Sequence, residues 1–280
     1  MADKAKKVVI VGGGGKMGAR FATSFAESGM EVSILEQGDW ANAANIVAGA
    51  SLVLVSVPIA VTDDVISRLP KLPQNCILAD LTSVKTGPVA AMMAAHDGPV
   101  VGFHPMFGAD FKNFNGQVIV HTSGRGDKSA LWLIDMFVSW GAKIQPSTPE
   151  QHDKAMVQVQ ALRHFTTFTY GSHLMAEGAN IDDLVAFSSP IYRLELAMVG
   201  RLFAQDPDLY TEIIFSSADN LTAIRKYADF FSNSVAMLEA GDKQGFKKEF
   251  SAVSDWMGDH AKQFYAETGD LIRLARDKDI

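Results

Sequence analysis

Two polar segments that follow neighbouring predicted strands carry side chains suited to oxidising an alcohol. Ser83 and Lys85 lie in the first segment and His104 in the second; the segments are Asp80-Leu-Thr-Ser-Val-Lys85 and Gly102-Phe-His-Pro-Met-Phe-Gly108. A neutral histidine accepts a hydroxyl proton readily near pH 7, so His104 is the candidate acceptor, with Ser83 on the neighbouring strand end. Lys85 is a candidate for substrate binding. The alternatives are that His104 is a turn histidine before Pro105 and that Lys85 only caps the following helix.

A glycine-rich turn near the N-terminus indicates a dinucleotide site. Gly13, Gly15 and Gly18 have the G-x-G-x-x-G spacing, between a predicted strand and a predicted helix. Such glycines permit a tight turn and let a pyrophosphate approach the backbone at a helix N-terminus. Glu36 follows Gly18 by 18 residues, where a carboxylate accepts hydrogen bonds from ribose hydroxyls and repels a 2′-phosphate. We therefore expect NAD rather than NADP; a glycine-rich turn without a ligand is the alternative.

The second half of the chain offers cationic and polar side chains on predicted helices. Gln160, His164 and Thr167 fall on one helical stripe, and such a stripe needs partners if it is buried. Arg193 and Arg201, on the same predicted helix, could each bind a carboxylate through two hydrogen bonds. An ion pair within the helix is the alternative for Arg193. The histidines lack a metal-ligand spacing, so we expect no metal site.

Alternating strands and helices predict the elements that position these residues. Short apolar runs with room for helices between them indicate a parallel sheet covered on both faces, a doubly wound α/β domain of the Rossmann type. In the sheet order 3-2-1-4-5-6, the ends of strands four and five, which carry Ser83 and His104, lie under the nicotinamide. The predicted strands are 8–12, 31–36, 51–57, 76–81, 100–104 and 117–122, with a short closing strand at 143–145.

The rest of the chain is predicted to be helical. Thr148-Pro-Glu-Gln151 has the residues of a capped helix start, and no strand-like alternation follows. We therefore expect a nucleotide-binding domain over 1–149 and an all-helical domain over 150–280. Several of these helices are apolar on more than one face, which favours burial against a partner chain.

Composition excludes several classes of protein. With 280 residues and 48% of them hydrophobic, the chain is long enough for two cores. A single cysteine, Cys76, excludes a disulfide framework and fits a reducing, cytoplasmic location. The longest apolar runs are shorter than the ~18 residues of a membrane span. A formal charge of −7 argues against nucleic acid as a partner, and leaves an anionic small substrate possible.

Motifs across the whole chain resemble the prephenate dehydrogenase family, closest to the dehydrogenase part of its bifunctional chorismate mutase–prephenate dehydrogenases. The His104 segment and the Ser188–Arg201 segment are the most specific of them. The matching segments are Val9-Ile-Val-Gly-Gly-Gly-Gly-Lys-Met-Gly18, Ser56-Val-Pro58, Asp80-Leu-Thr-Ser-Val-Lys85, His104-Pro-Met-Phe-Gly108, Gln160-Ala-Leu-Arg-His164 and Ser188-Ser-Pro-Ile-Tyr-Arg-Leu-Glu-Leu-Ala-Met-Val-Gly-Arg201.

This resemblance implies NAD-dependent oxidative decarboxylation of prephenate to 4-hydroxyphenylpyruvate, a step of tyrosine biosynthesis. It assigns the substrate hydroxyl to His104 with Ser83, a substrate carboxylate to Arg201, and pocket positions to His164 and Asp110. It also implies a homodimer through the helical domain and possible inhibition by tyrosine. The residues it places at the cofactor are Gly13, Gly15, Lys16, Met17, Gly18, Glu36, Ser56, Val57 and Pro58.

Other activities remain open at this point. An arogenate dehydrogenase would use the same groups on an amino-acid side chain. A β-hydroxyacid dehydrogenase has a similar glycine turn, but its interdomain helix carries a lysine followed by an asparagine, and this chain has Leu162-Arg-His-Phe165 there. A non-catalytic, NAD-responsive regulator is a third alternative. Seven residues precede the first predicted strand, so we expect no mutase activity from this chain.

Overall fold

The computed structural model describes residues 5–276, and side chains through residue 273. The chain divides into two compact units. The first comprises the described residues through Gln160 together with Asp208–Ser216, and the second comprises Ala161–Pro207 and the described residues from Ser217 onward. Each unit is described by itself below.

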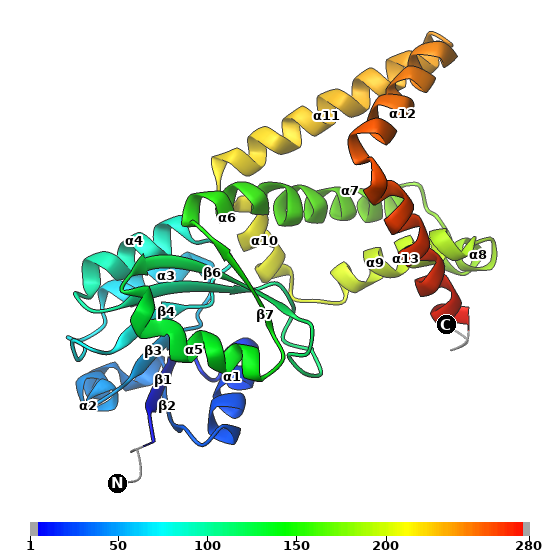
Figure 1. The fold of residues 1–280 in the computed structure, drawn as a ribbon. Helices are drawn as coiled ribbons and strands as arrows, with labels where there is room; N and C mark the ends of the chain where they lie inside the picture. The colour runs from blue at the N-terminus through cyan, green and yellow to red at the C-terminus, as the bar shows by residue number, and fades with distance from the viewer. Residues whose placement is uncertain (1–4, 277–280) are drawn as a thin grey trace. The chain divides into compact units, whose positions relative to one another are not determined.

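A seven-stranded sheet forms the centre of the first unit (Figure 1). Its order is β2-β1-β3-β4-β5-β6-β7, and every neighbouring pair is parallel except β5 and β6. The strands are β1 (Lys7–Val11), β2 (Glu31–Leu35), β3 (Leu52–Val55), β4 (Ile77–Asp80), β5 (Val100–Pro105), β6 (Val118–Arg125) and β7 (Lys143–Ser147).

The doubly wound architecture is confirmed, but the predicted order and the fully parallel direction are wrong. β3 lies beside β1 and not outside β2. All four residues of β3 are buried, which suits a central strand, whereas β2 is only partly buried and suits an edge. β6 is antiparallel to β5 because no helix interrupts residues 106–117 to carry the chain back to the opposite end of the sheet. β4 and β5 are nevertheless adjacent, as predicted.

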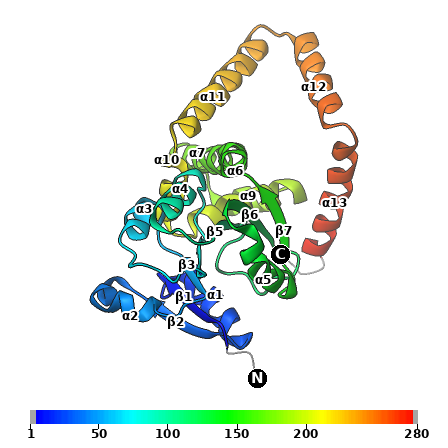
Figure 2. The same ribbon diagram turned by 60° about the vertical axis from the view of Figure 1, so that its left-hand side comes forward.

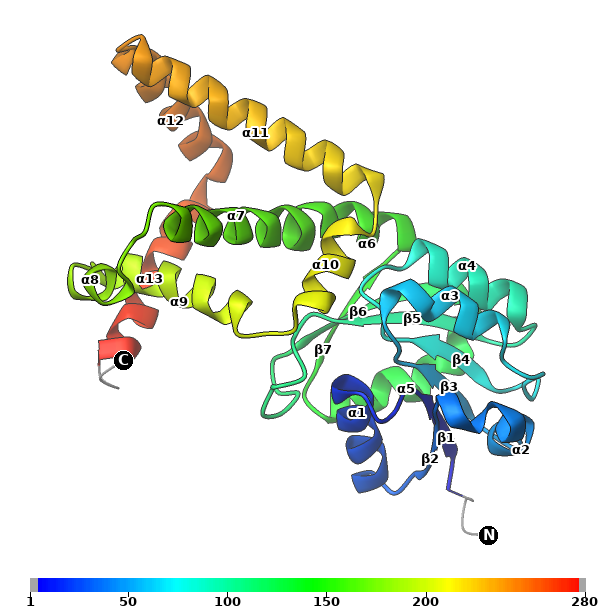
Figure 3. The same ribbon diagram turned by 180° about the vertical axis from the view of Figure 1, so that it is seen from behind.

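Helices cover both faces of the sheet (Figure 3). Phe21 and Phe25 of α1 (Lys16–Glu27) share one apolar cluster with Phe137 of α5 (Asp127–Ser139). The other face is covered by α2 (Ala43–Val47), which follows the 3₁₀ helix η1 (Gln37–Asn42), and by α3 (Ile59–Ser67) and α4 (Thr86–Ala95).

A long helical segment follows β7. α6 (Pro149–Met156) begins with the predicted capping box, in which Gln151 N donates to Thr148 Oγ1 at 3.2 Å. A π-helical segment, η2 (Val157–Leu162), then joins α6 to α7 (Arg163–Ala176). Because α6 packs on α4 and β6, the first unit continues to Gln160, past the predicted division between residues 149 and 150.

One later helix also belongs to the sheet unit. All of α10 (Pro207–Phe215) except its first residue lies in Asp208–Ser216, which belongs to the first unit. On it, Glu212 Oε2 accepts a hydrogen bond of 2.7 Å from the backbone N–H of Ala60, in the first turn of α3. A carboxylate at a helix N-terminus is favourable because the first N–H groups there have no partner within the helix.

The second unit is helical, and no described residue of it lies in a strand. α7 packs against α9 (Pro190–Phe203), and α8 (Ile181–Ala186) lies between them in the sequence (Figure 3). α11 (Ala218–Glu239), α12 (Lys243–Met257) and α13 (Asp259–Arg276) follow one another as an open arm (Figure 2). Among the described residues, no helix is both long enough and apolar enough to cross a membrane.

Candidate active site

His104 lies at the end of β5 and is almost fully buried. It pairs with Val120 of β6, and Pro105 is the last residue of the strand. Only 3% of its surface is exposed. Its Nδ1 lies 2.8 Å from Nε2 of His152, and its Nε2 lies 3.3 Å from the side-chain amide nitrogen of Gln160. Both nitrogens of the imidazole therefore have polar partners, on α6 and on the π-helical segment.

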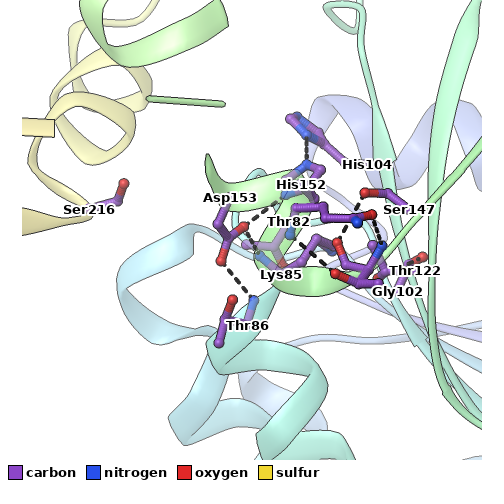
Figure 4. A network of polar contacts seen from close by, with 12 residues as sticks. Thr82, Lys85, Thr86, Gly102, His104, Thr122, Ser147, His152, Asp153 and Ser216 are labelled. Carbon is purple, nitrogen blue, oxygen red and sulfur yellow. Dashed lines mark hydrogen bonds and ion pairs between the residues drawn. The ribbon is translucent and has the colours of Figure 1, made fainter. Parts of the chain in front are cut away.

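His152 connects His104 to the carboxylate of Asp153 (Figure 4). His152 Nδ1 lies 2.8 Å from Asp153 Oδ1. The same carboxylate accepts hydrogen bonds from the backbone N–H groups of Lys85 (2.8 Å) and Thr86 (2.9 Å), at the start of α4. Burial alone would raise the pKa of Asp153, but the hydrogen bonds from His152, Thr86 and Lys85 outweigh it and lower this pKa to about 2. Asp153 is therefore ionised and caps α4.

Lys85, whose backbone N–H bonds to Asp153, has a fully buried side chain. It donates to Asp80 Oδ2 and, at 2.8 Å, to the Phe103 carbonyl. Burial lowers the pKa of Lys85, and the charges of Asp80 and Asp153 oppose that shift. With both of these contacts made to protein groups and no exposed surface, the geometry favours a supporting role for Lys85 over the expected contact with substrate.

The environment of His104 favours a neutral imidazole. Burial lowers the pKa of His104 well below 6.5, and the neighbouring His152 and Lys85 lower it further, while Asp153 opposes them. A neutral imidazole at physiological pH can accept a proton, which is the property the sequence predicted for this position. Ser83 lies two residues before Lys85, just beyond β4, and is half-buried. Its predicted contact with the substrate hydroxyl stays a prediction.

The glycine-rich turn has the geometry of a dinucleotide cradle. Gly12 has a φ of 78°, and a Cβ there would lie 2.5 Å from the Ser56 carbonyl oxygen. A Cβ at Gly18 would lie 2.5 Å from the Gly12 carbonyl oxygen, so this glycine lets α1 approach the turn closely. α1 begins after Gly15, which has no side chain to cap the first N–H groups. These features fit a pyrophosphate at the start of α1.

Glu36 lies directly after β2 and beside this turn, as predicted. Its Oε1 accepts a hydrogen bond of 2.6 Å from the backbone N–H of Gly14, and its own N–H donates to Asp39 at 2.9 Å. The other expected cofactor residues surround the same turn. Lys16 and Met17 begin α1, while Ser56, Val57 and Pro58 connect β3 to α3.

The remaining predicted substrate residues lie outside this cluster. His164 is on α7, and Arg193 and Arg201 are on α9, all in the second unit. Burial and the charge of Arg163 lower the pKa of His164. Asp110 is exposed in the loop between β5 and β6. Their roles toward substrate stay predictions.

Two residues of the His104 cluster were not predicted to have a role. His152 and Asp153 are adjacent in the sequence and directly follow Gln151, the last residue of the capping box of α6. The capping box could have placed them in the second turn of a helix. Their contact with His104 and α4, however, depends on where β7 joins the sheet, which local sequence patterns do not specify.

Comparisons with known proteins identify both halves of the chain. Residues 26–145 match the family described as prephenate dehydrogenase, nucleotide-binding domain. Residues 148–252 match prephenate dehydrogenase, dimerization domain. A crystal structure of prephenate dehydrogenase from A. aeolicus, in complex with hydroxyphenyl propionate and NAD+, has a similar fold: its TM-score is 0.65 at 20% sequence identity, over 97% of this chain and 100% of that one.

Two curated relatives are similar over nearly the whole chain. The T-protein of Enterobacter agglomerans is 49% identical over 277 residues, which cover 99% of this chain and 74% of that protein. The T-protein of Haemophilus influenzae is 47% identical over 272 residues, which cover 97% of this chain and 72% of that protein. With both of its domains matched and this level of identity, the chain belongs to the prephenate dehydrogenase family.

Proposed function

We propose that this protein catalyses the NAD-dependent oxidative decarboxylation of prephenate to 4-hydroxyphenylpyruvate and CO2. One observation carries the proposal: a buried imidazole with a depressed pKa, His104, lies at the end of β5, next to β4 in a sheet whose first turn has a dinucleotide cradle. Family membership names the substrate, and the product belongs to tyrosine biosynthesis.

His104 holds the alcohol of the substrate in this proposal. Its neutral imidazole accepts the proton of the ring hydroxyl, with Ser83 as a second partner of that hydroxyl. NAD+, when bound, supplies the acceptor for the hydride that leaves the same ring carbon. The bond between the ring and its carboxylate then breaks, CO2 leaves, and the electron pair of that bond makes the ring aromatic. The ring oxygen takes its proton back from the His104 imidazolium. The gain in aromaticity drives the reaction, so a moderate base is sufficient.

The two arginines of α9 are proposed to bind substrate carboxylate. Arg201 is the first candidate, because it matches the position that the family uses and a guanidinium binds a carboxylate through two parallel hydrogen bonds. Arg193 is the second. His164 and Asp110 are proposed as further substrate-binding residues, since they match such positions in the family. None of these roles requires a metal ion.

The proposed cofactor is NAD rather than NADP. Glu36 supports this choice, since its carboxylate lies 2.6 Å from the Gly14 N–H, beside the cradle, where the adenosine ribose binds in this fold. A 2′-phosphate brought there would meet a carboxylate. The adjacent Gln37, Gly38 and Asp39 supply no cation to offset the repulsion.

Product analysis tests the proposed reaction. Incubation with prephenate and NAD+ should yield NADH, CO2 and 4-hydroxyphenylpyruvate in equal amounts. Arogenate serves as the second substrate, because it differs only in carrying an amino group in place of the side-chain keto group. A higher kcat/KM for arogenate than for prephenate would change the proposed substrate but not the proposed type of reaction. Consumption of prephenate without formation of NADH would show that the reaction is not an NAD-dependent oxidation.

A second copy of the chain is the proposed partner. Large apolar side chains on the arm are exposed in the single chain, including Trp256 at 83% and Phe250 at 70%. Clusters of this kind mark interaction surfaces. The family description of residues 148–252 as a dimerization domain supports a homodimer. The exposed apolar residues of the arm are Leu221, Tyr227, Phe230, Phe231, Val235, Leu238, Phe246, Phe250, Val253, Trp256, Phe264, Tyr265 and Leu271.

Sedimentation of the purified chain tests the dimer. Phe250→Glu together with Trp256→Glu should shift it toward monomer, while Lys248→Glu, a charge change on the same helix, should leave the dimer intact. A wild-type monomer at micromolar concentration would contradict the proposal.

Regulation and location complete the proposal. We propose that tyrosine, the end product of the pathway, inhibits the enzyme, and that the enzyme works in the cytoplasm. Tyrosine resembles the product of the reaction in its ring and side chain, so it can compete for the same polar groups. Adding tyrosine at fixed prephenate should lower the rate of NADH formation, and an unchanged rate would remove this part of the proposal.

A further inference from the structure

A chain of hydrogen bonds links the catalytic imidazole to a carboxylate. His104 Nδ1 contacts His152 Nε2 at 2.8 Å, and His152 Nδ1 contacts Asp153 Oδ1 at 2.8 Å. The side chain of His152 is fully buried, and that of Asp153 is 30% exposed. Each ring nitrogen in this series of hydrogen bonds therefore has one identified partner. The donor and acceptor of each bond can be derived by starting from the carboxylate of Asp153.

The carboxylate fixes that direction. Asp153 already accepts the N–H groups of Lys85 and Thr86, and an ionised carboxylate only accepts. His152 must therefore donate from Nδ1. When His152 is neutral, donation from Nδ1 leaves its lone pair on Nε2, so that His152 accepts from His104. His104 then carries its proton on Nδ1 and its lone pair on Nε2.

The other side of the ring agrees with this assignment. The side-chain amide nitrogen of Gln160 lies 3.3 Å from His104 Nε2, and an amide nitrogen donates. Gln160 belongs to the π-helical segment, a form of helix that occurs often at functional sites. His104 Nε2 is thus the acceptor in this structure, and a substrate hydroxyl would take the place of the amide.

We propose that His152 and Asp153 are positioning residues that hold His104 in the tautomer with an unprotonated Nε2. The inference rests on the proposed function, because the tautomer matters only if Nε2 accepts the substrate proton. When it does, the O–H bond breaks and an Nε2–H bond forms, and the resulting imidazolium keeps its Nδ1–H bond to His152. The carboxylate of Asp153 stabilises the positive charge of this imidazolium, whereas the buried ammonium of Lys85 destabilises it.

Two substitutions at His152 separate a directional role from packing. His152→Leu fills the space but cannot accept from His104, so kcat should fall about 10- to 100-fold with little change in KM. His152→Gln keeps a carbonyl acceptor for Nδ1–H and should stay within about threefold of wild type. His96→Leu is the matched control: His96 is also buried and bonded through one ring nitrogen, to the Cys76 carbonyl, but is not part of the cluster. Equal losses in the Leu and Gln variants would overturn the inference.

Nitrogen-15 NMR of histidine-labelled protein reads the tautomer without turnover. The His104 signals are those lost in His104→Asn. The wild-type enzyme should show a protonated Nδ1 and an unprotonated Nε2, and His152→Leu should show a mixture of tautomers. A wild-type His104 protonated on Nε2 would overturn the inference. A wild-type enzyme that makes no NADH from prephenate would instead refute the proposed function, and the NMR result would still decide the tautomer.

Discussion

His104 and His152 share a hydrogen bond of 2.8 Å between Nδ1 and Nε2, although 48 residues separate them in the sequence. The contact joins the end of β5 to the second turn of α6. It ties the proposed proton acceptor to a helix that is itself anchored, through Asp153, to the N-terminus of α4. The geometry of the acceptor thus depends on three elements of the sheet unit.

The pH dependence should place the acid limb of the activity below pH 6.5. The pKa of His104 is lowered, so the neutral form persists as the pH falls past the ordinary histidine value, and activity is lost only as the pH falls through the folded pKa. The measurement is kcat/KM for prephenate between pH 5 and pH 9 at saturating NAD+. An acid limb above pH 7 would contradict a buried, neutral acceptor.

Removing the Asp153 carboxylate should destabilise the fold by about 1–3 kcal/mol at pH 7, because two backbone N–H groups of α4 and one imidazole lose their acceptor. Chemical denaturation of Asp153→Ala measures this, with Glu150→Ala, an exposed site on α6, as the control.

The difference between Asp153→Ala and wild type should also depend on pH in one direction. Since the pKa of Asp153 is lowered from 3.8 to about 2, its contribution to the free energy of unfolding is complete above pH 3.8 and disappears as the pH falls through 2. A difference that is the same at pH 7 and at pH 2 would show that the ionised carboxylate is not what stabilises α4.

Arg201→Lys should raise the KM for prephenate about 10- to 100-fold while kcat changes less, because a lysine cannot reproduce the paired hydrogen bonds of a guanidinium. Initial rates over a range of prephenate concentrations measure both constants. Arg193→Lys is the matched comparison on the same helix. If Arg193→Lys has the larger effect on KM, the carboxylate assignment moves to Arg193.

Glu36→Gln should lower the preference for NAD over NADP, measured as the ratio of the two kcat/KM values, by about tenfold or more. The amide removes the charge that repels a 2′-phosphate and can still accept from the Gly14 N–H. Glu31→Gln, at the opposite end of β2, removes an equal charge away from the cradle and should leave the ratio unchanged. Equal ratios in the two variants would exclude Glu36 from cofactor choice.

Local signals in the sequence were sufficient for much of the fold and part of the site. The capping box at Thr148 and the glycine turn before α1 depend on neighbouring residues, and both are present in the structure. The adjacency of β4 and β5 was expected from the strand order of a doubly wound sheet, and it is also present. These features also placed Glu36 and His104 correctly in the fold, at the ends of β2 and β5.

Local signals did not predict the contacts between residues that are far apart in the sequence. The position of β3 beside β1 depends on which strand is buried on both faces, and this becomes apparent only once the sheet is assembled. The hydrogen bond between Glu212 of α10 and Ala60 of α3 joins residues that are 152 apart in the sequence. His152 and His104 are also far apart in the sequence and meet only in the folded protein. For this reason the sequence predicted no role for His152.

Comparing NADH formation from prephenate by wild type and by His104→Asn tests the central claim most directly. The variant keeps a polar side chain but loses the proton acceptor, so turnover should fall by roughly 10²–10⁴ while NAD+ binding, followed by tryptophan fluorescence or calorimetry, stays at the wild-type level. Wild-type turnover of prephenate together with this loss is the predicted result. Unchanged turnover in His104→Asn would contradict the account, because the imidazole would then have no part in the chemistry.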